Sequence, residues 1–333
     1  MILLKTKEIS EFGFSVAVIR VKETKLLKKD FLINLCGLEK SEILKQFSGT
    51  IYEDFLKDIK TPEDLDKSLN DALKYFYSEV EEVDFANCIN SILRIRYDFF
   101  NLKYLLKAQV VNKEPFYLFD FANIDTSFMK KAVIDKNYSV LPYPFSEIFR
   151  EILEKIEILA PSEIEIFIDK KMLIYLFNKA VSFPFPILSE IIKMWIDYNN
   201  FMSFFRIKKL GLEFSDLEER LIKNGYIPIS FYKSSFDLPL EESVTLLSKG
   251  FYYKIFRHLD FSKENFLEDF EIAFENFFFE YLDQAKYIIF GIEPLIYYIL
   301  RREREIKILR WIILSKFFEV EKEIILKHVE SRI

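Results

Sequence analysis

A chain of 333 residues can hold two or three ordinary domains, or one large helical body. Half of its residues are hydrophobic and 17% are aromatic, which excludes a disordered chain. The net charge of -6 gives no support for a nucleic-acid binder, which normally presents an overall basic face.

Helical periodicity dominates the chain. Thr61 begins a predicted helix that runs to about Val80, because Thr-Pro-Glu-Asp supplies an N-cap, a proline at the first helical position and acids in the first turn. Apolar residues at helical spacing predict a second helix over residues 84–110 and another over 294–318. Loops marked by proline and glycine are expected at residues 142–144, 183–186 and 225–228. No convincing run of strands is present, so the predicted fold class is all-α.

Three segments of the sequence share one pattern. They are residues 94–102 (RIRYDFFNL), 193–201 (KMWIDYNNF) and 301–309 (RREREIKIL). Each has a basic residue, an acid four positions later, a further residue three positions on, and then an apolar residue. That further residue is Asn in the first two segments and Ile308 in the third. One basic–acidic pair at this spacing is an ordinary helix feature worth about 0.3–0.5 kcal/mol, but three at matching places indicate a reused structural element.

A weaker repeat supports the first one. Residues 48–52 (SGTIY) resemble residues 248–252 (SKGFY). We therefore predict three related helical units, with approximate boundaries at residues 1–110, 111–225 and 226–333, and we expect the N-terminal helix to pack on the last unit. Closure of three such units would give a body with an approximate central axis.

The repeated polar residues have two interpretations, and the sequence does not decide between them. Asp98 and Asn101 share one helical face, as do Asp197 and Asn200, because residues three apart are neighbours on a helix. Such a face packs inside the protein or caps a neighbouring helix in one reading. In the other reading it contacts a partner protein directly.

Residues and motifs typical of catalytic sites are few in this sequence. His258 and His328 are the only histidines, and neither has a second ligand at metal-binding spacing. The seven glycines form no phosphate-binding loop, and no nucleophile elbow is present. Cys36 and Cys88 are isolated, which favours free thiols in a reducing compartment over a disulfide. We predict no catalytic residue, no metal, no cofactor, no small-molecule substrate and no nucleic-acid partner.

Neither a signal peptide nor a transmembrane helix is predicted. Charges come early and often in the first sixteen residues. The apolar stretch at residues 287–300 is interrupted by Glu293 and falls short of the roughly 18 apolar residues that a span needs. A cytoplasmic location is therefore expected.

Several motifs, in this order and spacing, resemble the C subunits of the archaeal and bacterial V/A-type rotary ATPases, the counterparts of the d subunit in the eukaryotic vacuolar enzyme. The strongest lie at the C-terminal end: residues 290–294 (FGIEP), Tyr298, residues 305–310 (EIKILR) and Lys316. Others are residues 12–20 (FGFSVAVIR) followed by Leu26 and Leu27, residues 98–103 (DFFNLK), residues 197–200 (DYNN) and residues 225–228 (GYIP). The chain departs from the family pattern at Ile308, where Asn is usual, and in residues 203–206 (SFFR).

The resemblance implies a funnel-shaped, non-catalytic protein of three similar helical domains around a pseudo-threefold axis. It implies a place in the central stalk, on the cytoplasmic end of the membrane proteolipid ring and peripheral to the inner face of the membrane. The central cavity would receive the shaft made of the D and F subunits, and the rotor would couple ATP chemistry to transport of protons or sodium ions.

The repeats and the resemblance together give the candidate partner-binding residues. They are Arg94, Asp98, Asn101, Lys193, Asp197, Asn200, Arg206, Arg301, Glu305 and Arg310. Two other functions remain as alternatives. One is a generic helical scaffold or adaptor unrelated to rotary ATPases, and the other is an all-helical enzyme that uses carboxylates, with or without Mg²⁺.

Overall fold

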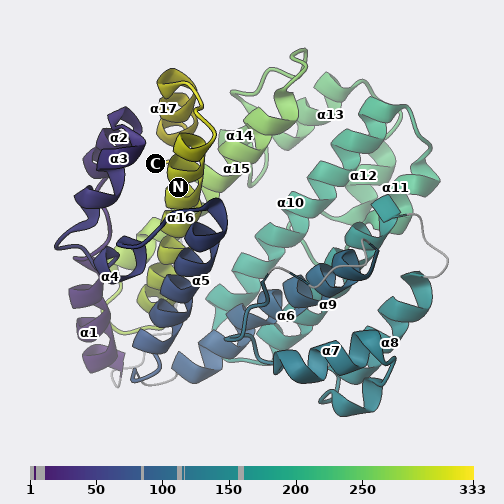
Figure 1. The fold of residues 1–333 in the computed structure, drawn as a ribbon. Helices are drawn as coiled ribbons and strands as arrows, with labels where there is room; N and C mark the ends of the chain where they lie inside the picture. Colours follow the sequence, from purple (N-terminus) through teal and green to yellow (C-terminus); the bar gives the residue numbers. More distant parts are fainter. Residues whose placement is uncertain (1–3, 5–11, 84–85, 111–114, 116, 157–160) are drawn as a thin grey trace. The chain divides into compact units, whose positions relative to one another are not determined.

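The computed structural model describes residues 1–333 apart from 1–3, 5–11, 84–85, 111–114, 116 and 157–160 (Figure 1). The described part consists of helices and connecting turns and contains no β-strand, which confirms the all-α prediction. Contacts divide the chain into two compact units. Residues 1–90 and 271–333 form one, called here the terminal unit, and residues 91–270 form the other, the middle unit.

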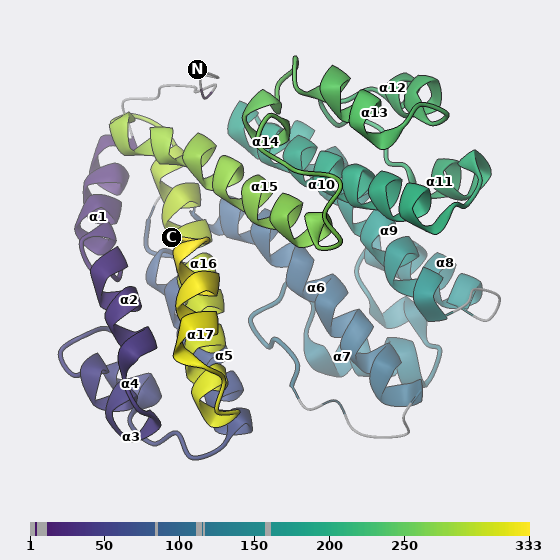
Figure 2. The same ribbon diagram turned by 90° about the horizontal axis from the view of Figure 1, so that it is seen from above.

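Helix α16 (Glu293–Phe317) is the core of the terminal unit. Most of its side chains are buried around its whole circumference, as expected of a helix surrounded by others. Helices α1 and α5 pack against it, and Figure 2 shows α1 running beside it. The other elements of this unit are α1 (Gly13–Glu23), α2 (Lys29–Gly37), α3 (Lys40–Ile43), η2 (Leu44–Phe47), α4 (Glu53–Leu56), α5 (Pro62–Glu79), η4 (Asp283–Tyr287) and α17 (Lys322–Glu330).

Helix α5 begins where its sequence predicts. The Thr61 side chain accepts a hydrogen bond from the backbone N–H of Asp64, and the Asp64 carboxylate accepts one from the N–H of Thr61. This reciprocal capping satisfies two donors that would otherwise have no partner within the helix. Pro62 takes the first helical position, where it has no N–H to lose.

The middle unit contains two helices of 25 and 21 residues that pack side by side, α10 (Pro186–Leu210) and α9 (Pro161–Val181). Gly211 ends α10 with a φ of 65°, the left-handed conformation that favours glycine. The chain enters this unit within α6 (Ala86–Val110) and leaves it within α15 (Phe266–Leu282). The other elements are α7 (Thr126–Ile134), η3 (Tyr138–Val140), α8 (Phe145–Ile156), α11 (Phe214–Arg220), α12 (Ile229–Ser235), α13 (Leu240–Leu247) and α14 (Tyr253–Phe256).

The many phenylalanines fill the cores. In the middle unit, Phe201 and Phe205 of α10 pack edge to face against Phe256 and Phe270, with ring centroids 5.1 to 6.4 Å apart. The run of phenylalanines in α15 is buried as well, with side-chain exposures of 4–7% from Phe274 to Phe279. Aromatic pairs of this geometry add about 0.5–1.5 kcal/mol beyond the area they bury. These phenylalanines therefore belong to the core.

The loops predicted at residues 142–144 and 225–228 lie between helices, and the one predicted at residues 183–186 ends at Pro186, the first residue of α10. Cys36 and Cys88 are both free thiols, and Cys36 is buried. Among the described residues, no helix combines the length and the hydropathy needed to cross a bilayer.

Candidate functional site

Three helices of equal length carry the three repeated segments. Helices α6, α10 and α16 each have 25 residues. Their repeated acids are buried, with exposures of 0% for Asp98, 0% for Asp197 and 5% for Glu305. A buried carboxylate is costly unless hydrogen-bond donors surround it, so the donors of each one define what it does.

Asp98 binds the chain that follows α6. One carboxylate oxygen accepts the backbone N–H of Ile124 at 2.8 Å, and the other accepts the side-chain amide of Asn123 at 2.9 Å. Burial raises the pKa of Asp98 to about 7, while these donors and the charge of Arg94 oppose the rise. The carboxylate therefore joins the middle of a long helix to a loop of the middle unit.

Asp197 binds the loop at residues 225–228 in the same way. It accepts the backbone N–H groups of Tyr226 at 2.7 Å and Ile227 at 3.2 Å, and the hydroxyl of Tyr252 at 2.8 Å. Burial again raises the pKa, to about 7. Gly225 packs directly against this carboxylate: a Cβ at that position would lie 2.0 Å from an Asp197 oxygen. Only glycine lets the loop approach so closely.

Glu305 holds two segments from the beginning of the chain. It accepts the backbone N–H of Leu27 at 2.6 Å and the hydroxyl of Tyr52 at 2.5 Å. Arg302, one turn earlier, donates to the same carboxylate at 2.6 Å. Glu305 thus joins two separate N-terminal segments to α16.

The weaker sequence repeat has a structural counterpart. Tyr52 and Tyr252 are fully buried, and each donates its hydroxyl to the repeated acid of a long helix, Glu305 and Asp197 respectively. The similar pentapeptides at residues 48–52 and 248–252 therefore place a tyrosine in the same role twice.

The repeated asparagines also share one geometry. Asn101 accepts the backbone N–H of Phe119 at 2.7 Å and donates to the carbonyl of the same residue at 2.9 Å. Asn200 makes the same pair of bonds to Ile222, both at 2.8 Å. A side-chain amide that satisfies both polar groups of one backbone residue replaces a missing strand or helix partner. In the third segment the buried, apolar Ile308 takes this position.

The five basic candidates have different surroundings. Arg94 and Lys193 are half-buried; Lys193 pairs with Glu190 at 3.2 Å and lies over the Tyr226 ring. Arg301 binds Asp283 at 2.5 Å. The remaining two are Arg310, which binds Asp66 and Asn70 at 2.8 Å each, and Arg206, which is exposed.

Arg302 was not among the predicted residues. The repeat indicated a pair between the basic and acidic positions four apart, but Glu305 pairs with Arg302, three positions away. The Arg302 guanidinium is fully buried and lies over the rings of Phe76 at 4.6 Å and Tyr298 at 5.1 Å. Two consecutive arginines at 301 and 302 indicated that one of them could pair with Glu305. The sequence does not indicate which of the two is buried.

The described residues hold no group of three His, Cys, Asp or Glu side chains that could bind a metal ion. His258 is exposed, and His328 stacks on Trp311 with ring centroids 4.0 Å apart. The hydrogen bonds of the repeated acids and asparagines thus link helices to loops.

Comparisons with known proteins cover nearly the whole chain. A family model described as ATP synthase (C/AC39) subunit matches residues 15–328. The chain is 24% identical over 322 residues to the C subunit of the A-type ATP synthase of Desulfurococcus sp. (strain SY), and the match covers 90% of this chain and 85% of that protein. It is 23% identical over 327 residues to the protein of the same name from Methanosarcina acetivorans, with 94% and 91% covered.

Proposed function

We propose that this chain, which belongs to the ATP synthase (C/AC39) subunit family, is a non-catalytic connector in the central stalk of a V/A-type rotary ATPase. In this proposal it couples the rotating shaft, made of the D and F subunits, to the membrane proteolipid ring. It lies peripherally on the cytoplasmic face of the membrane and turns with both partners. Torque then passes through it between ATP chemistry and ion movement.

The observation that carries the proposal is the extent of the family match. It runs from residue 15 to residue 328 and so includes both compact units and all three long helices. A generic scaffold that merely shared a helical fold would not be expected to align along its whole length with the C subunits of A-type ATP synthases.

The internal cross-links suit a part that transmits torque. Such a part must resist twisting, and packed helices with few glycines deform little. Asp98, Asp197 and Glu305 each tie the middle of a 25-residue helix to loops far away in sequence. Buried, fully satisfied polar groups of this kind favour one rigid arrangement over alternatives.

We also propose that the chain is built of three related repeats, close to residues 1–110, 111–225 and 226–333. The three equivalent carboxylates support this division, as do the two equivalent tyrosines. In the third repeat the donors to Glu305 come from Leu27 and Tyr52, so the N-terminal segment completes the unit built on α16.

Among the candidate partner-binding residues, we assign direct contacts to the basic ones. Arg206 is exposed, and four others keep part of their surface accessible: Arg94, Lys193, Arg301 and Arg310. The acids and amides have their hydrogen bonds met inside the chain. Asp98, Asn101, Asp197, Asn200 and Glu305 would then influence partners by fixing the loops that meet them.

The test is a pull-down of the tagged chain from gently solubilised native membranes, with native mass spectrometry of the captured complex. Co-purification of a proteolipid ring and of a coiled-coil shaft protein is the expected result. A variant with Arg206, Arg301 and Arg310 changed to alanine provides a comparison in which the capture of partners should weaken. A clean monomer under every mild detergent would favour the generic scaffold instead.

A further inference from the structure

The terminal unit contains a pocket of about 300 Å³ beside α16. Its wall carries five cationic side chains, Lys28, Lys29, Arg301, Arg304 and Arg332. Glu305 also lines it, but this carboxylate is bound by Arg302, Tyr52 and the Leu27 backbone. The wall therefore carries more positive than negative side chains.

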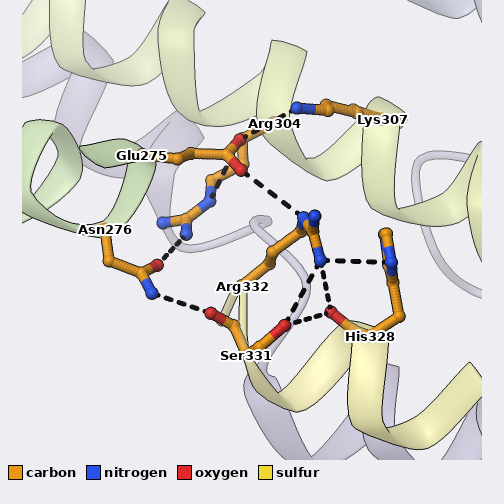
Figure 3. A network of polar contacts seen from close by, with 7 residues as sticks. All are labelled: Glu275, Asn276, Arg304, Lys307, His328, Ser331 and Arg332. Carbon is orange, nitrogen blue, oxygen red and sulfur yellow. Dashed lines mark hydrogen bonds and ion pairs between the residues drawn. The ribbon is translucent and has the colours of Figure 1, made fainter. Parts of the chain in front are cut away.

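The carboxylates that pair with these arginines are each shared among several cations. Figure 3 shows Arg304, Lys307 and Arg332 converging on Glu275, and the shortest distances are 4.0, 3.4 and 3.7 Å. One negative charge thus faces three positive ones. Asp283 is likewise shared, between Arg301 at 2.5 Å and Lys286 at 3.2 Å.

His328 adds no negative or positive charge to this cluster. A guanidinium group only donates hydrogen bonds, so the Nδ1 atom 3.1 Å from Arg332 must accept, and the ring is neutral. Burial, together with the charges of Arg332 and Lys307, lowers the pKa of His328 to about 4. The imidazole therefore accommodates Arg332 without repelling it.

Arg304 is one of the two buried members of the cationic wall, the other being Arg332. It is 7% exposed, and its terminal nitrogen donates to Asn276 at 2.6 Å. Its Nε atom is buried without a hydrogen-bond partner within the described part of the chain. Burial lowers its pKa to about 10, with Glu275 opposing this and Arg301 adding to it. A buried cation with an unmet donor is costly, and an anion in the adjoining pocket would offset that cost.

We propose that this pocket binds a small, multiply charged anion of the phosphate class. Guanidinium groups match the geometry of phosphate oxygens, and three of them line one cavity. Lys28 and Lys29 are exposed and provide further charge at the solvent side. The volume suits an inorganic oligophosphate or the phosphate group of a lipid headgroup, at the small end of ligand pockets.

Isothermal titration calorimetry with inorganic pyrophosphate, at constant ionic strength, tests the proposal on the full chain. We expect saturable binding to one site. The double variant Lys28→Ala/Lys29→Ala removes two exposed charges and should weaken binding on the order of tenfold. Arg304→Met keeps the side-chain volume and should abolish binding, and circular dichroism checks that it is folded.

The matched control is Lys57→Ala/Lys60→Ala, two exposed lysines of the same unit that do not line the pocket. This variant has the same net charge as Lys28→Ala/Lys29→Ala and should bind pyrophosphate like the wild type. Equal loss in both double variants, or no saturable binding at all, would overturn the proposal. Sedimentation with phosphatidylglycerol vesicles identifies the source: binding lost only in Lys28→Ala/Lys29→Ala indicates a lipid headgroup, and no vesicle binding indicates a free anion.

Discussion

Single buried acids fix the loops of this protein to its long helices, and their removal has a defined consequence. Asp197→Ala leaves the N–H groups of Tyr226 and Ile227 and the hydroxyl of Tyr252 without their acceptor. Each unmet buried donor costs about 1–3 kcal/mol, so we expect the free energy of unfolding to fall by about 3 kcal/mol in urea denaturation. Arg206→Ala, on the exposed side of the same helix, should change it by less than about 0.5 kcal/mol. Similar losses in the two variants would contradict this account.

The same burial predicts a pH dependence. Asp98 has a pKa of about 7 in the folded chain, against about 3.9 in an unfolded one. Between these values the folded chain binds more protons, so this residue makes stability fall as the pH rises from about 4 to about 7. Relative to Asp98→Asn, which has no carboxyl to titrate at this position, the free energy of unfolding of the wild type should fall by on the order of 2 kcal/mol between about pH 5 and about pH 8. Urea denaturation across this range measures the difference, and parallel pH profiles for the two proteins would contradict it.

At the residue scale, the sequence predicted which positions recur but not what they bind. The positions of Asp98, Asn101, Asp197 and Asn200 follow from local spacing, because a helix repeats every 3.6 residues. Their backbone partners lie 18 to 30 positions later in the chain, as the contacts of Asn101 and Asp197 illustrate. No local pattern specifies contacts of that separation. Arg302 was missed for a related reason, since only packing decides which of two adjacent arginines is buried.

At the scale of elements, one glycine sets how closely a loop approaches α10. A Cβ on Gly225 would lie 2.0 Å from an oxygen and 2.7 Å from the carboxyl carbon of Asp197. Gly225→Ala must therefore displace either the loop or the buried acid, and we expect a loss of about 2–4 kcal/mol in the free energy of unfolding. Gly250→Ala is the control, because its Cβ would meet only the Leu247 carbonyl oxygen at 3.6 Å, an ordinary contact.

Gly250→Ala should be neutral or stabilising by up to about 1 kcal/mol, since alanine restricts the unfolded chain. Thermal denaturation of both glycine variants provides the measurement. A Gly225→Ala protein as stable as Gly250→Ala would show that the loop does not need this close approach.

The helices themselves were the most predictable elements. Capping residues and prolines placed α5 at Pro62–Glu79 and α16 at Glu293–Phe317, within about two residues of the predicted ends. The predicted start of the second helix, at residues 84–85, lies outside the described residues, and α6 runs from Ala86 to Val110. Short helices such as α4 (Glu53–Leu56) were not predicted, because one turn carries too little periodicity to be recognised.

At the scale of the whole molecule, the proposal that the chain is built of related repeats can be tested by substituting two tyrosines. If Tyr52 and Tyr252 are equivalent, Tyr52→Phe and Tyr252→Phe should each remove one hydrogen bond to a buried acid and nothing else. We expect losses of about 1.5–3 kcal/mol that agree within about 1 kcal/mol, measured by urea denaturation. A loss in only one of the two would argue against the repeat.

The connector role is a claim about the whole molecule, and bridging tests it most directly. The purified shaft, made of the D and F subunits, would be immobilised and offered the isolated proteolipid ring in detergent, with and without this chain. We expect the ring to be retained only when the chain is present, because one copy binds both partners. Retention of the ring without the chain, or its absence with the chain bound to the shaft, would contradict the account.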